Sequence, residues 1–441
     1  MNYKSKLHDY IPGGAHTYSR GEDTVPANIP NVLKKGKDCY VWDMDDNKYL
    51  DYGMALRANI LGYANDDVDN AGIEEIKKGN NLTKPSEVEY LAAKKLVELI
   101  PWVDQVKFAK NGSNVTTAAV KLARAYTKKQ YVIICSDHPF FSFDDWFIGT
   151  TPVKRGTLFD KKCPFLKNSN DLKFKYNDLE SLENQFKKFP DDIAAVIMEP
   201  CTTEEPKIYE DNQNFLHKAH NLCKKYGSVF IMDEMITGFR FGITGACGVY
   251  NVKPDLVTYG KAIANGFSLA VLGGKKEIMS LGDVITEGRE RVFLLSSTHG
   301  AEMSSLGAMI KNIDILIENN VSEYIRNYGE RLINSANQIA KKLEVDKYFY
   351  FYGLPQNPYF ATNNKNGDSC LKFRTLFVQE MAKRKVIMAF VAISYSHKEE
   401  QLNITLKAIE ESLLVYKKAL ENGIDEYLES YIIKPVFRKY N

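Results

Sequence analysis

The sequence predicts an α/β protein with an open sheet, and three observations favour this class. Short apolar runs alternate along the chain with stretches of helical periodicity. Two of these runs end on an ionisable residue, at the position where strands of open α/β sheets meet a ligand. A second series of alternating helices and strands in the last third of the chain indicates a smaller α/β domain. The apolar runs that we interpret as strands of the larger domain cover residues 106–109, 131–135, 194–198, 229–232 and 255–259.

Helices and turns are predicted from their end signals. Ser86 is a favourable N-cap for a helix with apolar spacing, and Pro101 ends that helix. The alternating segment 38–52 contains an Asp-Asp-Asn turn and predicts a hairpin. We expect a turn at Gly273-Gly274. Further helices are expected at 178–186, 211–226, 371–384 and 398–421, with two more between 301 and 343, and small-domain strands are expected at 348–352 and 386–391.

Length and composition exclude several classes of protein. The chain has 441 residues, which allows one large and one smaller domain, and 44% hydrophobic with 26% charged residues is ordinary for a globular protein. The formal net charge of +2 leaves no basic excess for nucleic acid or an anionic membrane surface. The seven cysteines are scattered and form no CxxC pair, so we expect reduced thiols rather than disulfides or a zinc site.

The sequence also predicts where the protein resides. The first residues, MNYKSKLHDYIPGG, contain no apolar region of the signal-peptide kind. No run of 18 apolar residues occurs that could span a bilayer. We therefore expect a cytoplasmic protein.

Asp233 and Lys261 follow two apolar runs at the positions where the predicted strands end. A lysine and a carboxylate so placed suit pyridoxal 5'-phosphate (PLP), which is held as a Schiff base on a lysine with a carboxylate at its ring nitrogen. Lys261 would be the Schiff-base lysine, and Asp233 would hold the pyridinium proton through a charge-assisted hydrogen bond. The alternative is a helix-capping carboxylate and a solvated surface lysine.

Two motifs around these residues point to a family. DEMITGFRFG, which begins at Asp233, and YGKAIANGF, which contains Lys261, resemble the class-III, fold-type I, PLP-dependent aminotransferases, and most of all glutamate-1-semialdehyde 2,1-aminomutase and its relatives. The resemblance runs from about residue 10 to about residue 415. It implies a large domain at 56–305 with a mostly parallel, seven-stranded sheet between helices. A small α/β domain would combine the N-terminal segment 1–55 with residues 306–441.

The resemblance also implies residues that bind the cofactor. Gly112 and Ser113 follow a predicted strand and open a helix, where backbone N–H groups can hold a phosphate, and they match the family's phosphate-binding turn. Phe140 matches the aromatic residue that stacks on the ring, with Phe141 or His138 as alternatives. Each of these side chains could equally be part of the core. Glu199 matches a glutamate beside the cofactor, and Ile236 would pack on the ring face opposite the aromatic, with a place in the core as the alternative. Residues 150–175 are expected to form a long loop that acts as a lid.

Other implied residues concern the substrate and the assembly. Thr298 matches a threonine that binds the PLP phosphate of the neighbouring subunit, which implies a homodimer with shared active sites. Arg20, in a Gly/Pro-rich loop, matches an arginine that binds the substrate carboxylate. Leu56 and Arg57 replace a tryptophan of the aminomutases, and this departure suggests a polar or anionic substrate. An ordinary surface ion pair of Arg57 is the alternative.

The sequence thus predicts an aminotransferase that moves an amino group from an amino donor to an aldehyde or ketone, on a sugar-like or other polar metabolite. The first alternative is glutamate-1-semialdehyde 2,1-aminomutase activity, in which one molecule gives and receives the nitrogen. The second is a non-catalytic binding protein with the same fold, and a different kind of α/β enzyme is a third. Intact Asp233, Lys261, Glu199 and Thr298 disfavour the non-catalytic alternative.

Overall fold

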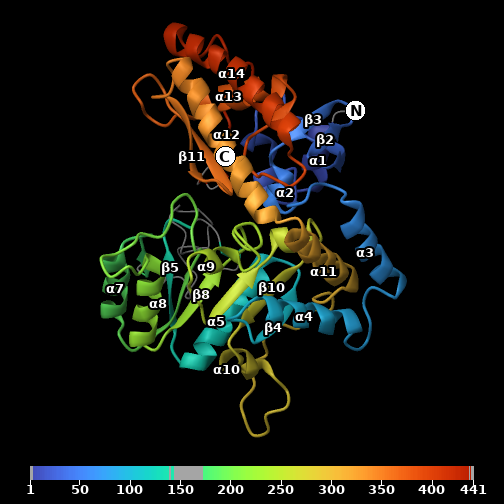
Figure 1. The fold of residues 1–441 in the computed structure, drawn as a ribbon, viewed down its shortest axis with the longest axis vertical. Helices are drawn as coiled ribbons and strands as arrows, with labels where there is room; N and C mark the ends of the chain where they lie inside the picture. The colour runs from blue at the N-terminus through green and yellow to red at the C-terminus, as the bar shows by residue number, and fades with distance from the viewer. Residues whose placement is uncertain (1–2, 139–140, 144–171, 437, 439–441) are drawn as a thin grey trace. The chain divides into compact units, whose positions relative to one another are not determined.

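The computed structural model describes residues 3–138, 141–143, 172–436 and 438. The chain forms two compact units, which Figure 1 shows in colours that follow the sequence. The large unit contains residues 66–323, and the small unit combines residues 1–65 with 324–438. Both crossings between the units lie later in the chain than the predicted boundaries after residues 55 and 305.

The large unit is built on a seven-stranded sheet with the strand order β4-β10-β9-β8-β7-β5-β6. β10 is antiparallel to both of its neighbours, and the strands from β9 to β6 run parallel to one another. This is the mostly parallel sheet that the sequence predicts. The strands are β4 (Gln105–Ala109), β5 (Tyr131–Cys135), β6 (Lys173–Phe174), β7 (Ile193–Met198), β8 (Val229–Asp233), β9 (Leu256–Tyr259) and β10 (Ala270–Gly274).

Helices flank the strands along the chain. α5 has a continuous buried face that packs on the sheet, because its alanine, valine and leucine residues recur at helical spacing. The Ser86 side chain accepts the Glu89 N–H at 3.3 Å, so Ser86 caps the N-terminus of the helix that begins at Glu87, as predicted. The helices of this unit are α3 (Asp66–Lys77), α4 (Glu87–Leu99), α5 (Gly112–Thr127), α7 (Leu179–Lys188), α8 (Phe215–Lys225), α9 (Gly245–Val249), α10 (Lys276–Met279) and α11 (Met303–Glu318), with 3-10 turns η3 (Lys261–Ala264) and η4 (Ser280–Gly282).

The expected turn at Gly273-Gly274 is wrong. Both glycines lie in β10, which pairs with β4 and β9. A Cβ on Gly273 would lie 3.0 Å from Val103, and one on Gly274 would lie 2.5 Å from Leu256. The glycines therefore permit close packing within a strand, a role that sequence alone does not separate from a turn.

The small unit combines the two ends of the chain. Its four-stranded sheet has the order β1-β2-β3-β13, with the C-terminal β13 parallel to β3, and β11 and β12 form a separate antiparallel hairpin. The hairpin predicted at 38–52 is confirmed as β2 and β3. The strands are β1 (Leu33–Lys37), β2 (Tyr40–Asp43), β3 (Lys48–Asp51), β11 (Phe349–Leu354), β12 (Asn357–Thr362) and β13 (Val386–Ile387). The helices are α1 (Tyr3–Tyr10), α2 (Met54–Arg57), α12 (Val321–Lys342, which begins in the large unit), α13 (Leu371–Lys383) and α14 (Glu399–Asn422), with 3-10 turns η1 (Tyr18–Arg20) and η2 (Glu22–Thr24).

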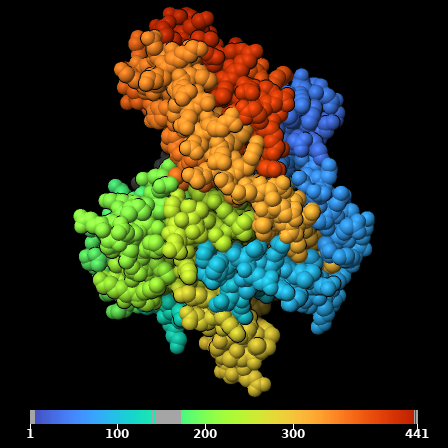
Figure 2. Space-filling model, in the orientation of Figure 1, coloured from blue at the N-terminus to red at the C-terminus, as the bar shows by residue number. Residues whose placement is uncertain are grey.

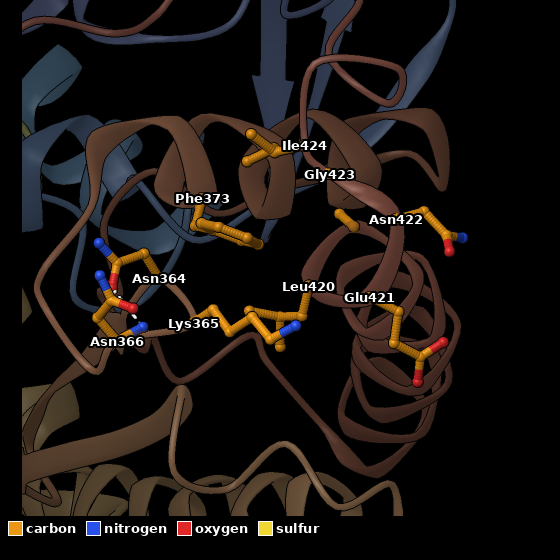
Figure 3. Close-up of a pocket in the computed structure, with 10 residues that line it drawn as sticks. Asn364, Lys365, Asn366, Phe373, Leu420, Glu421, Asn422, Gly423 and Ile424 are labelled. Carbon is orange, nitrogen blue, oxygen red and sulfur yellow. Dashed lines mark hydrogen bonds between the residues drawn. The ribbon is translucent and has the colours of Figure 1, made fainter.

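Two surface features complete the description. The gold segment after α10 projects from the large unit in Figure 2, and its Val284 and Ile285 are 78% and 83% exposed. In the small unit, a hollow of about 460 Å³ lies between the 364–366 loop and the end of α14, with Phe373 and Leu420 at its wall (Figure 3). Within the described residues, no helix has the length and apolar character needed to cross a membrane.

Candidate active site

Asp233 is the last residue of β8, and its side chain is buried. Its Oδ1 accepts the Met235 N–H at 3.0 Å and the Thr258 hydroxyl at 3.1 Å. Burial raises the pKa of this carboxyl to about 6, against the lowering effects of the Met235 N–H, the Lys261 charge and the Thr258 hydroxyl. A cationic group beside Asp233 would therefore stabilise its charged form.

The neighbouring Glu234 is also buried, but the chain itself surrounds it with donors. Its carboxylate accepts the N–H groups of Ala246 at 3.1 Å and Cys247 at 2.7 Å, together with the Thr237 hydroxyl. A Cβ on Gly245 would lie 2.5 Å from Glu234 Oε1, so this glycine, at φ +70°, fits closely against the carboxylate. Glu234 therefore holds the segment after β8 in place, and Asp233 is the carboxylate left for a ligand.

Lys261 lies just beyond β9, the strand next to β8, and opens η3. Its φ of 45° is in the left-handed region, which ordinary residues rarely adopt. Strained backbone of this kind concentrates at functional sites. The charge of Lys261 lowers the pKa of Asp233, so the two groups predicted to act together are electrostatic neighbours.

Gly112 and Ser113 form the first turn of α5, after β4 and the N-cap Asn111. The Asn111 side chain accepts the Asn114 N–H at 3.1 Å. Buried Ser113 accepts the Phe143 N–H through its Oγ at 3.2 Å, which ties the segment after β5 to this helix start. A helix of this length has a positive dipole end and N–H groups without intrahelical partners, and the two together suit a phosphate.

Met235 connects the two turns, and sequence reasoning missed it. A Cβ on Gly112 would lie 3.0 Å from Met235 Sδ, and one on Gly260 would lie 2.5 Å from the same atom. The Met235 side chain thus fills the space between the helix start and the lysine turn. Ile236, which we expected beside the ring, is partly buried one residue further on. The sequence signal for Met235 is indirect. Gly112 and Gly260, in two separate motifs, both lack the Cβ that would meet this side chain.

Glu199 follows β7 and is buried at 6% exposure. Its N–H donates to His138 Nδ1 at 2.9 Å, and burial lowers the pKa of this histidine to about 3. Phe141 is buried, and its carbonyl accepts the Thr116 hydroxyl at 2.9 Å. Phe140 lies outside the described residues, as does most of the expected lid at 150–175, whose last part contains β6.

Thr298 lies in an exposed turn before α11. Its carbonyl accepts the Asn81 amide at 2.9 Å, and the same amide lies 3.5 Å from His299 Nδ1. His299 is also 3.2 Å from Glu302. The turn is therefore held by polar contacts while the Thr298 side chain is open to the surface.

The two predicted substrate-binding arginines belong to the small unit. Arg20 ends η1 and is exposed. Arg57 ends α2 and is partly buried, and its Nε donates to Asn357 Oδ1 at 2.7 Å. Its guanidinium lies 5.8 Å from the centre of the Tyr359 ring. The hollow in Figure 3 is lined by none of the predicted site residues.

The residues of the large unit fit PLP. A buried carboxylate with a raised pKa is suited to a cationic ring nitrogen, and its neighbour Lys261 supplies the amine. Gly112 leaves room at a helix start where a Cβ would press on Met235, and this helix start supplies a phosphate site.

Comparison with known proteins agrees with this geometry. The model of the family "Aminotransferase class-III" matches residues 22–349, so the chain belongs to the class-III aminotransferases. A 3-aminobutyryl-CoA aminotransferase of Cloacimonas acidaminovorans is 31% identical, covering 95% of this chain and 98% of that protein. A glutamate-1-semialdehyde 2,1-aminomutase of Francisella tularensis subsp. tularensis is 30% identical, covering 91% of this chain and 95% of that protein.

Solved structures show the same fold. A transaminase with PLP bound aligns with a TM-score of 0.83 at 20% identity, covering 96% of this chain and 97% of that one. An omega-transaminase from Sphaerobacter thermophilus aligns with a TM-score of 0.81 at 22% identity, covering 94% of this chain and 96% of that one. The protein is therefore a PLP-dependent enzyme of fold-type I, acting on an amino donor and a carbonyl acceptor.

Proposed function

We propose that the protein is an aminotransferase that passes an amino group to an aldehyde or ketone acceptor carried by a polar, sugar-like metabolite. The observation that best supports catalysis is the pairing of Asp233 and Lys261 at the ends of neighbouring strands. The replacement of the aminomutase tryptophan by Leu56 and Arg57 favours transfer between separate molecules.

Each residue of the large unit has a proposed task. PLP, when bound, supplies an electron sink for the substrate's α-carbon. Lys261 would hold the cofactor through Nζ and, once released, move a proton at the substrate α-carbon. Asp233 would accept the hydrogen bond of the ring nitrogen and keep that nitrogen charged.

The remaining contacts would position the cofactor. Gly112 and Ser113 would bind its phosphate at the start of α5. Met235, which backs both turns, would pack on one face of the ring in place of Ile236. Phe140 would cover the other face, and Glu199 would lie beside the ring, as the family resemblance implies.

We also propose a homodimer in which Thr298 binds the phosphate in the partner's site. The exposed side of the Thr298 turn supports this, as do Val284, Ile285 and Phe293, which are 78%, 83% and 63% exposed. Exposed large apolar side chains in one segment of the chain are suited to cover by a second subunit. Arg20 would bind a substrate carboxylate, and location in the cytoplasm stays a prediction.

The experiment loads the protein with pyridoxamine phosphate and offers it a panel of carbonyl acceptors. The panel contains keto and aldehydo sugars, 2-oxo acids, 3-oxobutyryl-CoA (which has a carbonyl group where 3-aminobutyryl-CoA has its amine) and glutamate-1-semialdehyde. We expect an amine product from at least one acceptor other than glutamate-1-semialdehyde, with recovery of the yellow PLP form. Lys261→Ala should form the amine product about 10²-fold more slowly or less.

Other outcomes identify the alternatives. Conversion of glutamate-1-semialdehyde alone, without release of a second carbonyl product, would identify an aminomutase. A protein that stays colourless with added PLP would exclude the proposed chemistry altogether.

A further inference from the structure

Asn312, on α11, is a buried amide that contacts the turn beginning at Lys261. Its side chain is 0% exposed. Its Nδ2 donates to the Ala262 carbonyl at 2.9 Å and to the Ile263 carbonyl at 2.8 Å. These two residues follow Lys261 directly in the 3-10 turn η3. One side chain of the large unit therefore uses both of its N–H groups on the lysine turn.

The segment that carries Lys261, between β9 and β10, has an unusual backbone. Lys261, Asn265 and Gly266 have φ values of 45°, 44° and 99°. Glycine accepts such angles freely, whereas residues with a Cβ adopt them at a cost. Strained backbone of this kind persists only where the surrounding structure fixes it. The two hydrogen bonds from Asn312 come from outside the segment and meet this need next to Lys261 itself.

The start of α11 contacts the other end of the same segment. The Ser305 hydroxyl donates to the Ser268 carbonyl at 3.1 Å. Lys110 Nζ donates to the same carbonyl at 3.0 Å and lies 2.6 Å from the Glu302 carboxylate. The Ser268 hydroxyl in turn donates to the Lys110 carbonyl at 2.8 Å. Residues on or next to one helix therefore hold the lysine segment at its beginning and at its end.

The chemistry of position 312 calls for an amide. The Ala262 and Ile263 carbonyls only accept hydrogen bonds, so the group that faces them must supply two N–H donors. Aspartate has none, and an apolar side chain has no polar atom at all. Among the described residues, Asn312 Oδ1 is buried without a hydrogen-bond partner. That cost would be avoided by an apolar side chain of similar size, so the asparagine is better explained by the turn than by core packing.

We propose that Asn312 is a positioning residue for amino transfer, which fixes the η3 turn so that the Lys261 amine is held where it carries PLP and moves the proton. Groups that react need a closely set geometry, and a misplacement of about 1 Å can slow a reaction by about 10²-fold. Asn312 acts through the backbone that follows Lys261, from a helix about 50 residues further along the chain. The proposal rests on the role of Lys261 in the proposed function, and it adds the residue that sets the geometry of that lysine.

The test follows the bond between PLP and Lys261 directly. Apoprotein is mixed with PLP, borohydride is added at timed intervals to fix the cofactor, and mass spectrometry measures the fixed fraction of the peptide that contains Lys261. Asn312→Leu should slow this reaction by about 10-fold or more, because two hydrogen bonds to the turn are lost. The absorbance of the bound PLP is also titrated against pH. Its midpoint should differ between Asn312→Leu and wild type, because the amine is held differently.

Asn337→Leu is the matched control. Asn337 lies on α12 in the small unit and also makes two hydrogen bonds to backbone, donating to the Phe351 carbonyl at 2.9 Å and accepting the Phe351 N–H at 2.7 Å. Its loss should lower stability but leave the rate of PLP attachment and the pH midpoint as in wild type. Asn312→Ser keeps one donor and should lie between Asn312→Leu and wild type.

Two results would overturn the proposal. One is a wild-type rate and midpoint in Asn312→Leu, and the other is equal slowing in Asn337→Leu. Circular dichroism checks that each variant is folded, and if Asn312→Leu is not, Asn312→Ser decides by the same criteria. A wild-type protein in which borohydride fixes no PLP on Lys261 would instead contradict the proposed function, so the two failures are distinguishable.

Discussion

The candidate active site of the large unit and the predicted substrate-binding residues of the small unit differ in the charges they carry. In the large unit, the buried ionisable groups at the strand ends include the carboxylates Asp233 and Glu199, with one lysine beside them. In the small unit, the predicted substrate-binding residues are the arginines Arg20, which is exposed, and Arg57, which is half-buried beside Tyr359. Residues of the first kind follow the family motifs, whereas Arg57 departs from them. The comparison teaches that the residues predicted for the cofactor and those predicted for the substrate lie in two different units of the chain.

The largest effect should come from Lys261, which sharpens the large-unit side of this comparison. Lys261→Ala removes the amine that holds the cofactor and moves the proton, so we expect a loss of activity of about 10²–10⁴-fold. The matched control is Lys275→Ala, which removes a lysine paired with Asp255 at 2.6 Å at the end of β10. Its amino-transfer rate should stay near that of wild type. Equal losses in the two variants, measured with one acceptor, would contradict the assignment.

The second prediction concerns pH and the apoprotein. Asp233 has a pKa of 3.8 in the unfolded chain and about 6 when buried, so its neutral form favours folding. Its contribution is therefore complete below pH 3.8 and is lost as the pH rises through 6. With 1.36 kcal/mol per pKa unit, the free energy of unfolding should fall by about 3 kcal/mol from this group.

The measurement is urea unfolding of apoprotein and of Asp233→Asn at pH 4 and pH 8. The wild type should lose more stability than the variant over this range, and bound PLP should remove the difference. The same pH dependence in both proteins would show that Asp233 does not titrate as its burial predicts.

Asp233 and Glu234 allow a third test between adjacent buried carboxylates. Asp233→Asn should slow amino transfer by about 10–150-fold, the value of one hydrogen bond to a charged group, with a small change in the melting temperature of the PLP-loaded protein. Glu234→Ala should lower stability by about 1–3 kcal/mol, because the Ala246 and Cys247 N–H groups lose their acceptor. Amino-transfer rates and melting temperatures of both variants test whether Asp233 serves the reaction and Glu234 serves stability. Reversed effects would assign the ligand role to Glu234.

The smallest effect is expected at Gly112. Gly112→Ala places a Cβ 3.0 Å from Met235 Sδ, and the flexible methionine can move away. We expect PLP binding to weaken by about 10-fold, near the lower end of the cost of overpacking. Gly242→Ala is the control, because its Cβ would meet no atom closer than 3.9 Å. Equilibrium dialysis against PLP measures both, and equal affinities would show that this helix start does not hold the cofactor.

The parts of this molecule that sequence predicts are those in which local pattern and burial agree. Strands β7 and β8 are continuous apolar runs, and the residues that follow or end them, Glu199 and Asp233, could be placed from the pattern alone. β10 was missed because its two glycines serve packing against Val103 and Leu256, which are distant in sequence. The position of Met235 depends on two turns at once, and no single motif reports it.

The turn that holds Arg57 was harder to foresee for a physical reason. Arg57 was singled out by its departure from the family, but nothing local predicts positive φ for residues with a Cβ. That backbone depends on Asp51 and Tyr63, and its contacts with Asn357 come from the far end of the chain.

The turn from Met54 to Arg57 has a consequence for laboratory evolution. Ala55 and Leu56 adopt backbone angles that glycine accepts freely and that cost other residues of the order of 1 kcal/mol each. New activities usually reduce thermal tolerance, because most substitutions weaken a protein. Glycine at position 55 or 56 should instead relieve the strain of this turn and raise heat resistance, since the Asp51 and Tyr63 contacts that hold the backbone would remain.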